Sequence, residues 1–157
     1  GAADPMRAAI LNSAYTFNRT SPPADNARAA AMVEFLAADY RWDVRWTEFT
    51  PIAGGMLDAA RDELHAAYGI APGATPQAVV DGLYLASRSL AGGTPPALPP
   101  DVFAQPALTL ARLSQPAELP ATRHATSLVE RELYRIDNDR MVGGGQGGSG
   151  GGGGSQQ

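Results

Sequence analysis

The chain has 157 residues, 44 % of them hydrophobic, and a net charge of −4, which suits one folded domain and argues against a general nucleic-acid binder. It contains no cysteine and no lysine, so thiol nucleophiles, disulfides, thiolate metal sites and lysine-based catalysis are excluded. All twelve basic residues are arginine, and alanine, glycine and proline are abundant, a composition that indicates a GC-rich bacterial or phage genome.

The first part of the chain predicts a strand followed by a helix. Residues 7–15 form a short apolar run that is typical of a buried strand. The two prolines in 16–23 favour a loop, and Asp25 is placed to cap a helix over 26–38. The apolar residues of that helix repeat with a period close to 3.6, and they are Ala29, Met32, Val33 and Leu36.

Residues 40–49, "YRWDVRWTEF", alternate strictly between two kinds of side chain, which predicts a second strand. One face carries Tyr40, Trp42, Val44 and Trp46, and the other carries Arg41, Asp43, Arg45 and Thr47. We expect the aromatic face to form core and the charged face to meet solvent. The alternative is a contact surface, because tryptophan and arginine anchor many interfaces.

The middle of the chain predicts two helices. The first covers 53–69, where Gly69 suits the position just after a helix. The second covers 74–93, with Thr75 as its N-cap and Pro76 at its first position. The sequence therefore predicts a β-α-β-α opening followed by a helix-rich half.

The last part of the chain predicts a short helix, a longer helix and a hairpin. Residues 101–115 read as a helix with Asp101 as its possible cap, provided that Pro106 lies in the first turn. Residues 120–142 predict a helix and then a hairpin that turns at "DND", 137–139. The predicted fold class is α/β or α+β, and a mostly α-helical fold is the alternative.

The C-terminal segment 143–157 holds ten of the eighteen glycines and carries no charge. We expect a flexible tail there, after a single compact domain over 6–142. An expression linker and a native hinge to a further domain both explain this composition. Residues 1–5 also leave two explanations open, a cloning remnant and the new end of a processed chain.

The titratable residues form no recognisable catalytic or metal-binding motif. The two histidines, His65 and His124, are far apart in the chain, and neither belongs to a zinc-binding spacing. The Asp-Asn-Asp triplet 137–139 lacks the further ligands of a calcium loop, and no nucleophile elbow is present. We therefore predict no catalytic residue, no metal ligand and no cofactor.

Two segments resemble known families. Residues 7–44 resemble the opening strand and helix of bacterial caspase-like domains, and residues 42–64 resemble the second strand and loop of toll/interleukin-receptor-type domains. Both resemblances imply a flavodoxin-like start. They carry no site residue across, because the first family needs a histidine–cysteine dyad and the second a glutamate after a serine–tryptophan stretch.

The function expected from these observations is non-enzymatic. We predict a protein–protein interaction or assembly module, a structural subunit of a larger protein or particle, in the cytoplasm or in an assembled bacterial or phage particle. No export signal or membrane span is expected, and no nucleic acid partner. A flavodoxin-like enzyme or enzyme remnant is the alternative. We expect the partner to be another protein or a second copy of the chain. It would contact segment 94–120 and two arginines of segment 40–49. The candidate contact residues are Phe103, Leu108, Leu110, Leu113, Arg41 and Arg45.

Overall fold

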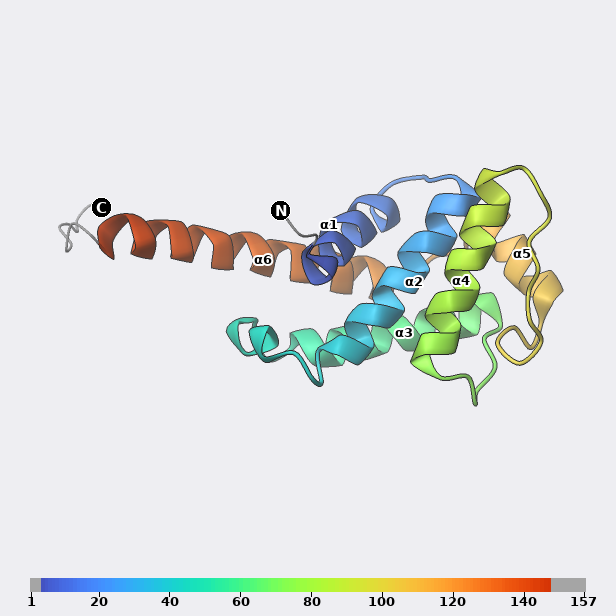
Figure 1. Cartoon of the computed structure of the whole chain (residues 1–157), viewed down its shortest axis with the longest axis horizontal. Coiled ribbons are helices and arrows are strands. Elements are labelled where there is room, and N and C mark those ends of the chain that lie inside the picture. The colour runs from blue at the N-terminus through green and yellow to red at the C-terminus, as the bar shows by residue number, and fades with distance from the viewer. Residues whose placement is uncertain (1–3, 148–157) are drawn as a thin grey trace.

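The structure, a computed structural model, describes residues 4–147 of the chain, with side-chain surroundings through residue 143. Within this range the fold consists of six α-helices and one short 3-10 helix (Figure 1). Among residues 4–147 the β pairing consists of one isolated bridge between Ile70 and Phe103. The predicted α/β or α+β fold is therefore wrong, and the mostly α-helical alternative fits. The flavodoxin-like start implied by the two resemblances is wrong for the same reason.

Helix α1 (Pro5–Phe17) replaces the strand predicted at 7–15. The Asp4 carboxylate accepts a hydrogen bond from the backbone N–H of Arg7 at 3.2 Å, so it caps the helix, and Pro5 takes the first helical position. Most buried side chains recur every three or four residues, as a helix requires. The buried residues of α1 are Met6, Ala9, Ile10, Ser13, Ala14, Thr16 and Phe17.

Helix α2 (Pro23–Asp39) lies at the centre of the fold and confirms the helix predicted at 26–38. It packs against α1, α3, α4 and α5, and is therefore buried on nearly every side. Five of its buried residues are alanines, whose small side chains let the neighbouring helices approach closely: Ala27, Ala29, Ala30, Ala31 and Ala37.

The strand predicted at 40–49 is wrong. The chain turns after α2, where the Asp39 carbonyl accepts hydrogen bonds from the N–H groups of Trp42 and Asp43, and then forms the 3-10 helix η1 (Val44–Glu48). The Asp43 carboxylate caps η1 through the N–H of Arg45 at 2.9 Å. Local backbone and side-chain hydrogen bonds thus satisfy this segment without a partner strand.

Helices α3 (Ala53–Tyr68) and α4 (Pro76–Ala91) confirm the two predicted helices of the middle part. Gly69 ends α3 with φ 63°, a left-handed conformation that glycine adopts without strain. The Thr75 hydroxyl caps α4 by accepting the N–H of Ala78 at 3.2 Å. Helix α4 packs along α2 on the outside of the bundle (Figure 1).

Helix α5 (Pro106–Ser114) is shorter than the predicted helix 101–115. Pro106 takes its first position, which confirms the condition placed on that proline, whereas Asp101 lies in a turn upstream and caps nothing in α5. Two hydrogen bonds flank the bridge before α5: the N–H of Ala71 donates to Val102 at 2.7 Å, and the N–H of Ala104 donates to Gly69 at 2.9 Å.

Helix α6 (Pro120–Gly147) runs straight through the predicted hairpin, so the turn at 137–139 is wrong. Its buried stripe continues with helical spacing to the end of the core: Thr122, Ala125, Thr126, Val129, Leu133 and Ile136. Asp137 pairs with Arg7 of α1 and Asp139 with Arg135 of the same helix, so two residues of the triplet stabilise the helix.

The expected tail divides into two parts. Residues 143–147 continue α6, although glycine is a poor helix former, and residues 148–157 lie outside the described residues.

One hydrophobic core extends from Met6 in α1 to Ile136 in α6. Beyond that point α6 extends past the other helices (Figure 1).

Candidate functional site

The six residues proposed for contact fall into different environments. Phe103 and Leu113 are buried in the core, and the Phe103 ring packs against Gly82 of α4. Leu108 is half-buried, and Leu110 is 39 % exposed. Segment 94–120 therefore offers single exposed residues, because its larger side chains close the domain's own core.

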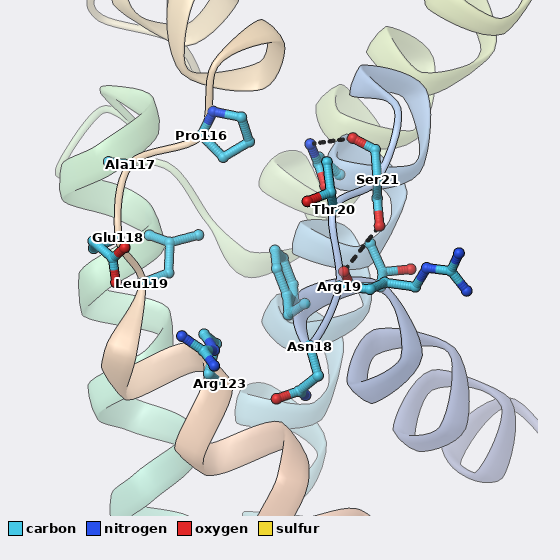
Figure 2. Close-up of a pocket in the computed structure, with 12 residues that line it drawn as sticks. Asn18, Arg19, Thr20, Ser21, Pro116, Ala117, Glu118, Leu119 and Arg123 are labelled. Atoms are coloured by element: carbon cyan, nitrogen blue, oxygen red, sulfur yellow. Dashed lines mark hydrogen bonds between the residues drawn. The ribbon is translucent and has the colours of Figure 1, made fainter.

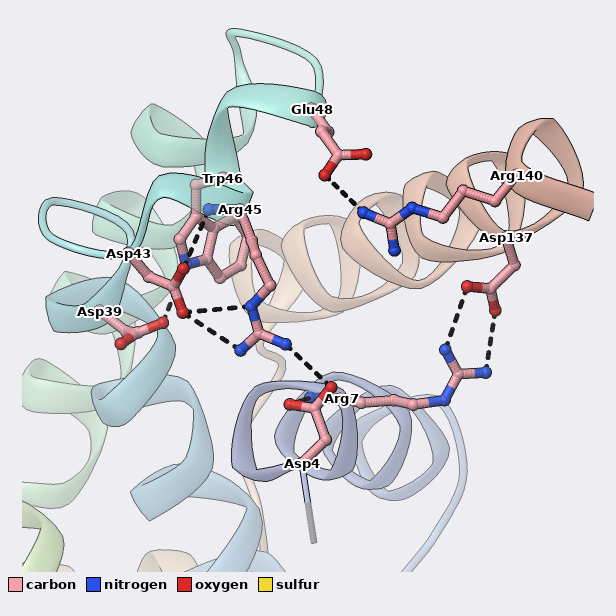
Figure 3. Close-up of polar contacts among 9 residues, drawn as sticks. All are labelled: Asp4, Arg7, Asp39, Asp43, Arg45, Trp46, Glu48, Asp137 and Arg140. Atoms are coloured by element: carbon pink, nitrogen blue, oxygen red, sulfur yellow. Dashed lines mark hydrogen bonds and ion pairs between the residues drawn. The ribbon is translucent and has the colours of Figure 1, made fainter. Parts of the chain in front are cut away.

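Arg41 and Arg45 both hold the turn after α2 in place. Arg41 donates to the Ala37 carbonyl at 2.9 Å and to Asp58 of α3 at 3.0 Å. Arg45 pairs with Asp43 at 3.1 Å and with Asp4, ahead of α1, at 2.9 Å (Figure 3). The two arginines thus join the turn to two different helices.

The carboxylates that face Arg45 remain charged to lower pH than usual. The pKa of Asp43 is lowered by hydrogen bonds from the backbone N–H and then the guanidinium of Arg45. Burial alone would raise the pKa of Asp4, but hydrogen bonds from the side chain of Arg45 and the N–H of Arg7 give a net lowering. Both ion pairs are therefore intact at neutral pH.

Helix α6 holds the other end of the turn. Arg140 pairs with Glu48 at 2.5 Å (Figure 3). Arg135 donates to the backbone carbonyl of the same glutamate at 2.8 Å. Glu132 accepts the N–H of Thr50 at 2.6 Å, and the hydrogen bond from Arg135 lowers the pKa of Glu132. Segment 40–50 is thereby tied to α1, α3 and α6.

The two tryptophans of this segment have opposite environments. Trp46 is 7 % exposed, packs against the Phe49 ring at 4.6 Å between centroids, and donates from Nε1 to Asp39 at 3.0 Å. Trp42 is 85 % exposed and Val44 is 76 % exposed. The prediction that the aromatic face forms core is therefore correct for Trp46 and wrong for Trp42 and Val44. We call residues 40–48 the Trp42 turn.

A cleft of about 350 Å³ opens at the C-terminal end of α1, whereas the Trp42 turn lies at its N-terminal end (Figure 2). One wall is formed by residues 16–21 together with Asn26, and the other by residues 116–119 together with Arg123. No single helix carries both walls. Residues 116–119 belong to the predicted contact segment 94–120, whereas residues 16–21 were predicted only to include a loop. No local pattern announces such a cleft, because its two walls are about a hundred positions apart in the chain.

Buried hydrogen bonds fix the wall that precedes α2. Asn26, which is 4 % exposed, donates from Nδ2 to the carbonyls of Ser21 and Leu113, at 3.3 Å each. The Ser21 hydroxyl donates to the Thr16 carbonyl at 2.9 Å. The Asn26 amide therefore ties the loop to the end of α5.

The two histidines have different environments. His65 lies 2.5 Å from the carboxylate of Glu34, which is buried in α2, whereas His124 is exposed on α6. Among residues 4–147 no group of three or more histidine, aspartate and glutamate side chains is placed to hold a metal ion.

Over the same range, no helix combines the length and the apolar character that a membrane crossing requires.

No protein-family model, curated protein or solved structure matches this chain. Any functional inference therefore rests on the geometry of the Trp42 turn and of the cleft.

Proposed function

We propose that this helical domain is a non-enzymatic protein–protein interaction module that docks a partner through the Trp42 turn. The observation that carries the proposal is the combination of a large apolar side chain, Trp42, that is 85 % exposed with a backbone held by ion pairs to α1, α3 and α6. Single exposed apolar residues are common on soluble proteins, but two of them on a turn fixed in this way are a more specific feature.

Fixing the turn favours binding for a thermodynamic reason. A flexible loop loses conformational entropy when a partner orders it, and this loss reduces affinity. Here Arg41 and Arg45 already restrain the turn, so Trp42 and Val44 are presented in one geometry. Tryptophan is among the residues that contribute most to interfaces, since its large ring leaves water on binding.

The partner that suits this turn is a protein with an apolar pocket. The indole of Trp42 would fill the pocket, and Arg41, whose side chain is 44 % exposed, lies next to it in the chain and is able to meet an acidic rim. A second copy of the chain and a different protein are both covered by the proposal. The flavodoxin-like enzyme alternative loses its basis with the helical fold.

The test compares two exposed aromatic residues. Trp42→Ala removes the proposed anchor, and Tyr15→Ala removes an aromatic side chain of α1 that is 64 % exposed. Sedimentation velocity reports self-association, and capture from the native extract, quantified by mass spectrometry, reports a second protein. We expect one association that Trp42→Ala abolishes and Tyr15→Ala retains. A monomeric wild-type chain with no Trp42-dependent partner would contradict the proposal.

A further inference from the structure

We propose that the cleft between residues 16–21 and 116–119 binds a small carboxylate that carries an apolar group. The proposal does not depend on the function of the Trp42 turn, which the bundle holds at the other end of α1. It rests on the size of the cleft, on the chemistry of its lining and on Arg123, one of the two arginines that line it.

The size of the cleft suits a small organic molecule. Its volume of about 350 Å³ lies at the lower end of the range of ligand pockets, roughly 300–1,000 Å³. The lining is mixed, as in most such pockets: Phe17 and Leu119 provide buried apolar surface, and Thr20 and Arg123 provide hydrogen-bond donors. In Figure 2 the Leu119 side chain points across the gap toward the loop that carries Thr20.

The charges around the cleft leave Arg123 as the group that would meet a ligand. Arg19 lines the cleft but points away from it in Figure 2, and its guanidinium bonds the Tyr15 hydroxyl and stacks over the ring at 4.4 Å. The Glu118 carboxylate also turns away from the gap. Within residues 4–147 Arg123 takes part in no ion pair.

Two helices begin near the cleft, but their N-termini add little to its preference for an anion. Helix α2 has no side-chain cap at Pro22, yet residues 22–25 of its start do not line the cleft. Asp25 in the first turn also offsets the partial positive charge of this helix end. The N-terminus of α6 contributes less, because Glu63 already accepts the N–H groups of Ala121 and Thr122.

A carboxylate fits this lining better than a phosphate. Arg123 is a single cation, so it matches one negative charge, and its planar guanidinium binds both oxygens of a carboxylate. A phosphate dianion would find one arginine, with Glu118 close by in the chain, and would gain nothing from Phe17 and Leu119. A group of about the size of a leucine side chain would instead cover those two residues.

Two sources share this chemistry: a free organic acid and the C-terminus of a peptide. The first probe pair is 4-methylpentanoate and its neutral amide. The second pair is N-acetyl-alanyl-leucine and its C-terminal amide. Binding to the uniformly labelled chain is followed by NMR, where the amide signals of residues 18–21 and 117–119 report on the cleft.

We expect saturable shifts of these signals with both acids, and affinities for the amides that are lower by about ten-fold, the effect of one charge-assisted hydrogen bond. Arg123→Gln should weaken acid binding by a similar factor. Arg131→Gln, on the exposed face of the same helix, is the matched control and should bind as the wild type does. A tighter complex with the peptide acid identifies a chain terminus as the source, and a tighter complex with the free acid identifies a small metabolite.

The acid and amide comparison uses the wild-type chain, so it holds even if a variant fails to fold. Three results overturn the proposal: no saturable shift with either acid, equal affinity for acids and amides, or acid binding that Arg123→Gln leaves unchanged. Shifts that saturate but map outside both walls of the cleft overturn it as well.

Discussion

Trp42 and Trp46 lie four residues apart in one turn, yet one indole faces solvent and the other is part of the core. Trp46 is held by Asp39 and by the ring of Phe49, whereas Trp42 extends from a backbone that its neighbours Arg41 and Asp43 hold in place. The difference shows that hydrogen bonds and ion pairs within one short segment can hold one tryptophan in the core and leave another exposed. Trp46 lies in the core, and Trp42 is the side chain that we propose as the anchor for a partner.

The largest effect is expected for the buried member of the pair. Trp46→Ala should lower the free energy of unfolding by about 3–5 kcal/mol, because it removes a large core side chain and leaves the Asp39 carboxylate without its indole donor. Urea unfolding followed by circular dichroism measures the change. A loss below about 1 kcal/mol would mean that Trp46 is no core residue.

A smaller effect is expected at Gly54 of α3, which packs against the Tyr40 ring of the Trp42 turn. A Cβ atom there would lie 2.0 Å from the Tyr40 ring, so Gly54→Ala must push that ring away from its hydrogen bond with Asp58. We expect a loss of about 1–3 kcal/mol in the free energy of unfolding.

The neighbouring glycine gives the control for this substitution. A Cβ atom at Gly55 would meet nothing within 4 Å, so Gly55→Ala should stabilise the helix by about 0.5–1 kcal/mol. Equal effects of the two substitutions in urea unfolding would contradict the contact between Gly54 and Tyr40.

The ion pairs of Arg45 with Asp4 and Asp43 should make the stability of the fold depend on pH. The folded-state pKa values of Asp4 and Asp43 are lowered, so these groups stabilise the fold above the unfolded value of about 4, and that stabilisation is lost as the pH falls through the folded values. Arg45→Gln should therefore flatten the acid side of a plot of urea midpoint against pH. An unchanged acid limb would show that Arg45 does not hold these carboxylates.

The smallest effect on stability is expected for the exposed tryptophan. Trp42→Ala should change the free energy of unfolding by no more than about 0.5 kcal/mol, as for other surface positions. Acrylamide should quench the fluorescence of Trp42 in Trp46→Phe far more than that of Trp46 in Trp42→Phe. Comparable quenching of the two would remove the contrast between them.

The helices at 26–38, 53–69 and 74–93 were predictable from the sequence because their apolar period and their end signals agree. Helix α1 carried the same kind of signals, an aspartate–proline pair at its start and apolar positions such as Met6, Ile10 and Phe17 at helical spacing. The short stretch 7–15 was nevertheless read as a strand, since a short run rich in apolar residues fits a buried strand as well as a buried helix.

The turn and the cleft were beyond a local prediction. A strict alternation is a strand only if a neighbouring strand pairs with it, and here hydrogen bonds to Asp39 and Asp43 bend the backbone first. The triplet 137–139 suggested a turn, but contacts of α6 with α1 decide for a helix. The cleft joins residues near positions 20 and 118, which only the packing of helices brings together.

The bridge between Ile70 and Phe103 bears on how the domain opens as well as on how it folds. Both ends of the segment that carries α4 meet at this bridge, through the hydrogen bonds of Ala71 and Ala104. If α4 swings away from α2, the chain on either side can stay joined, so the helix can detach as a closed loop without unfolding α3 or α5. Native-state hydrogen exchange should then find α4 to be a separate opening unit, with the amides of Ala71 and Ala104 protected longer than those of the helix between them.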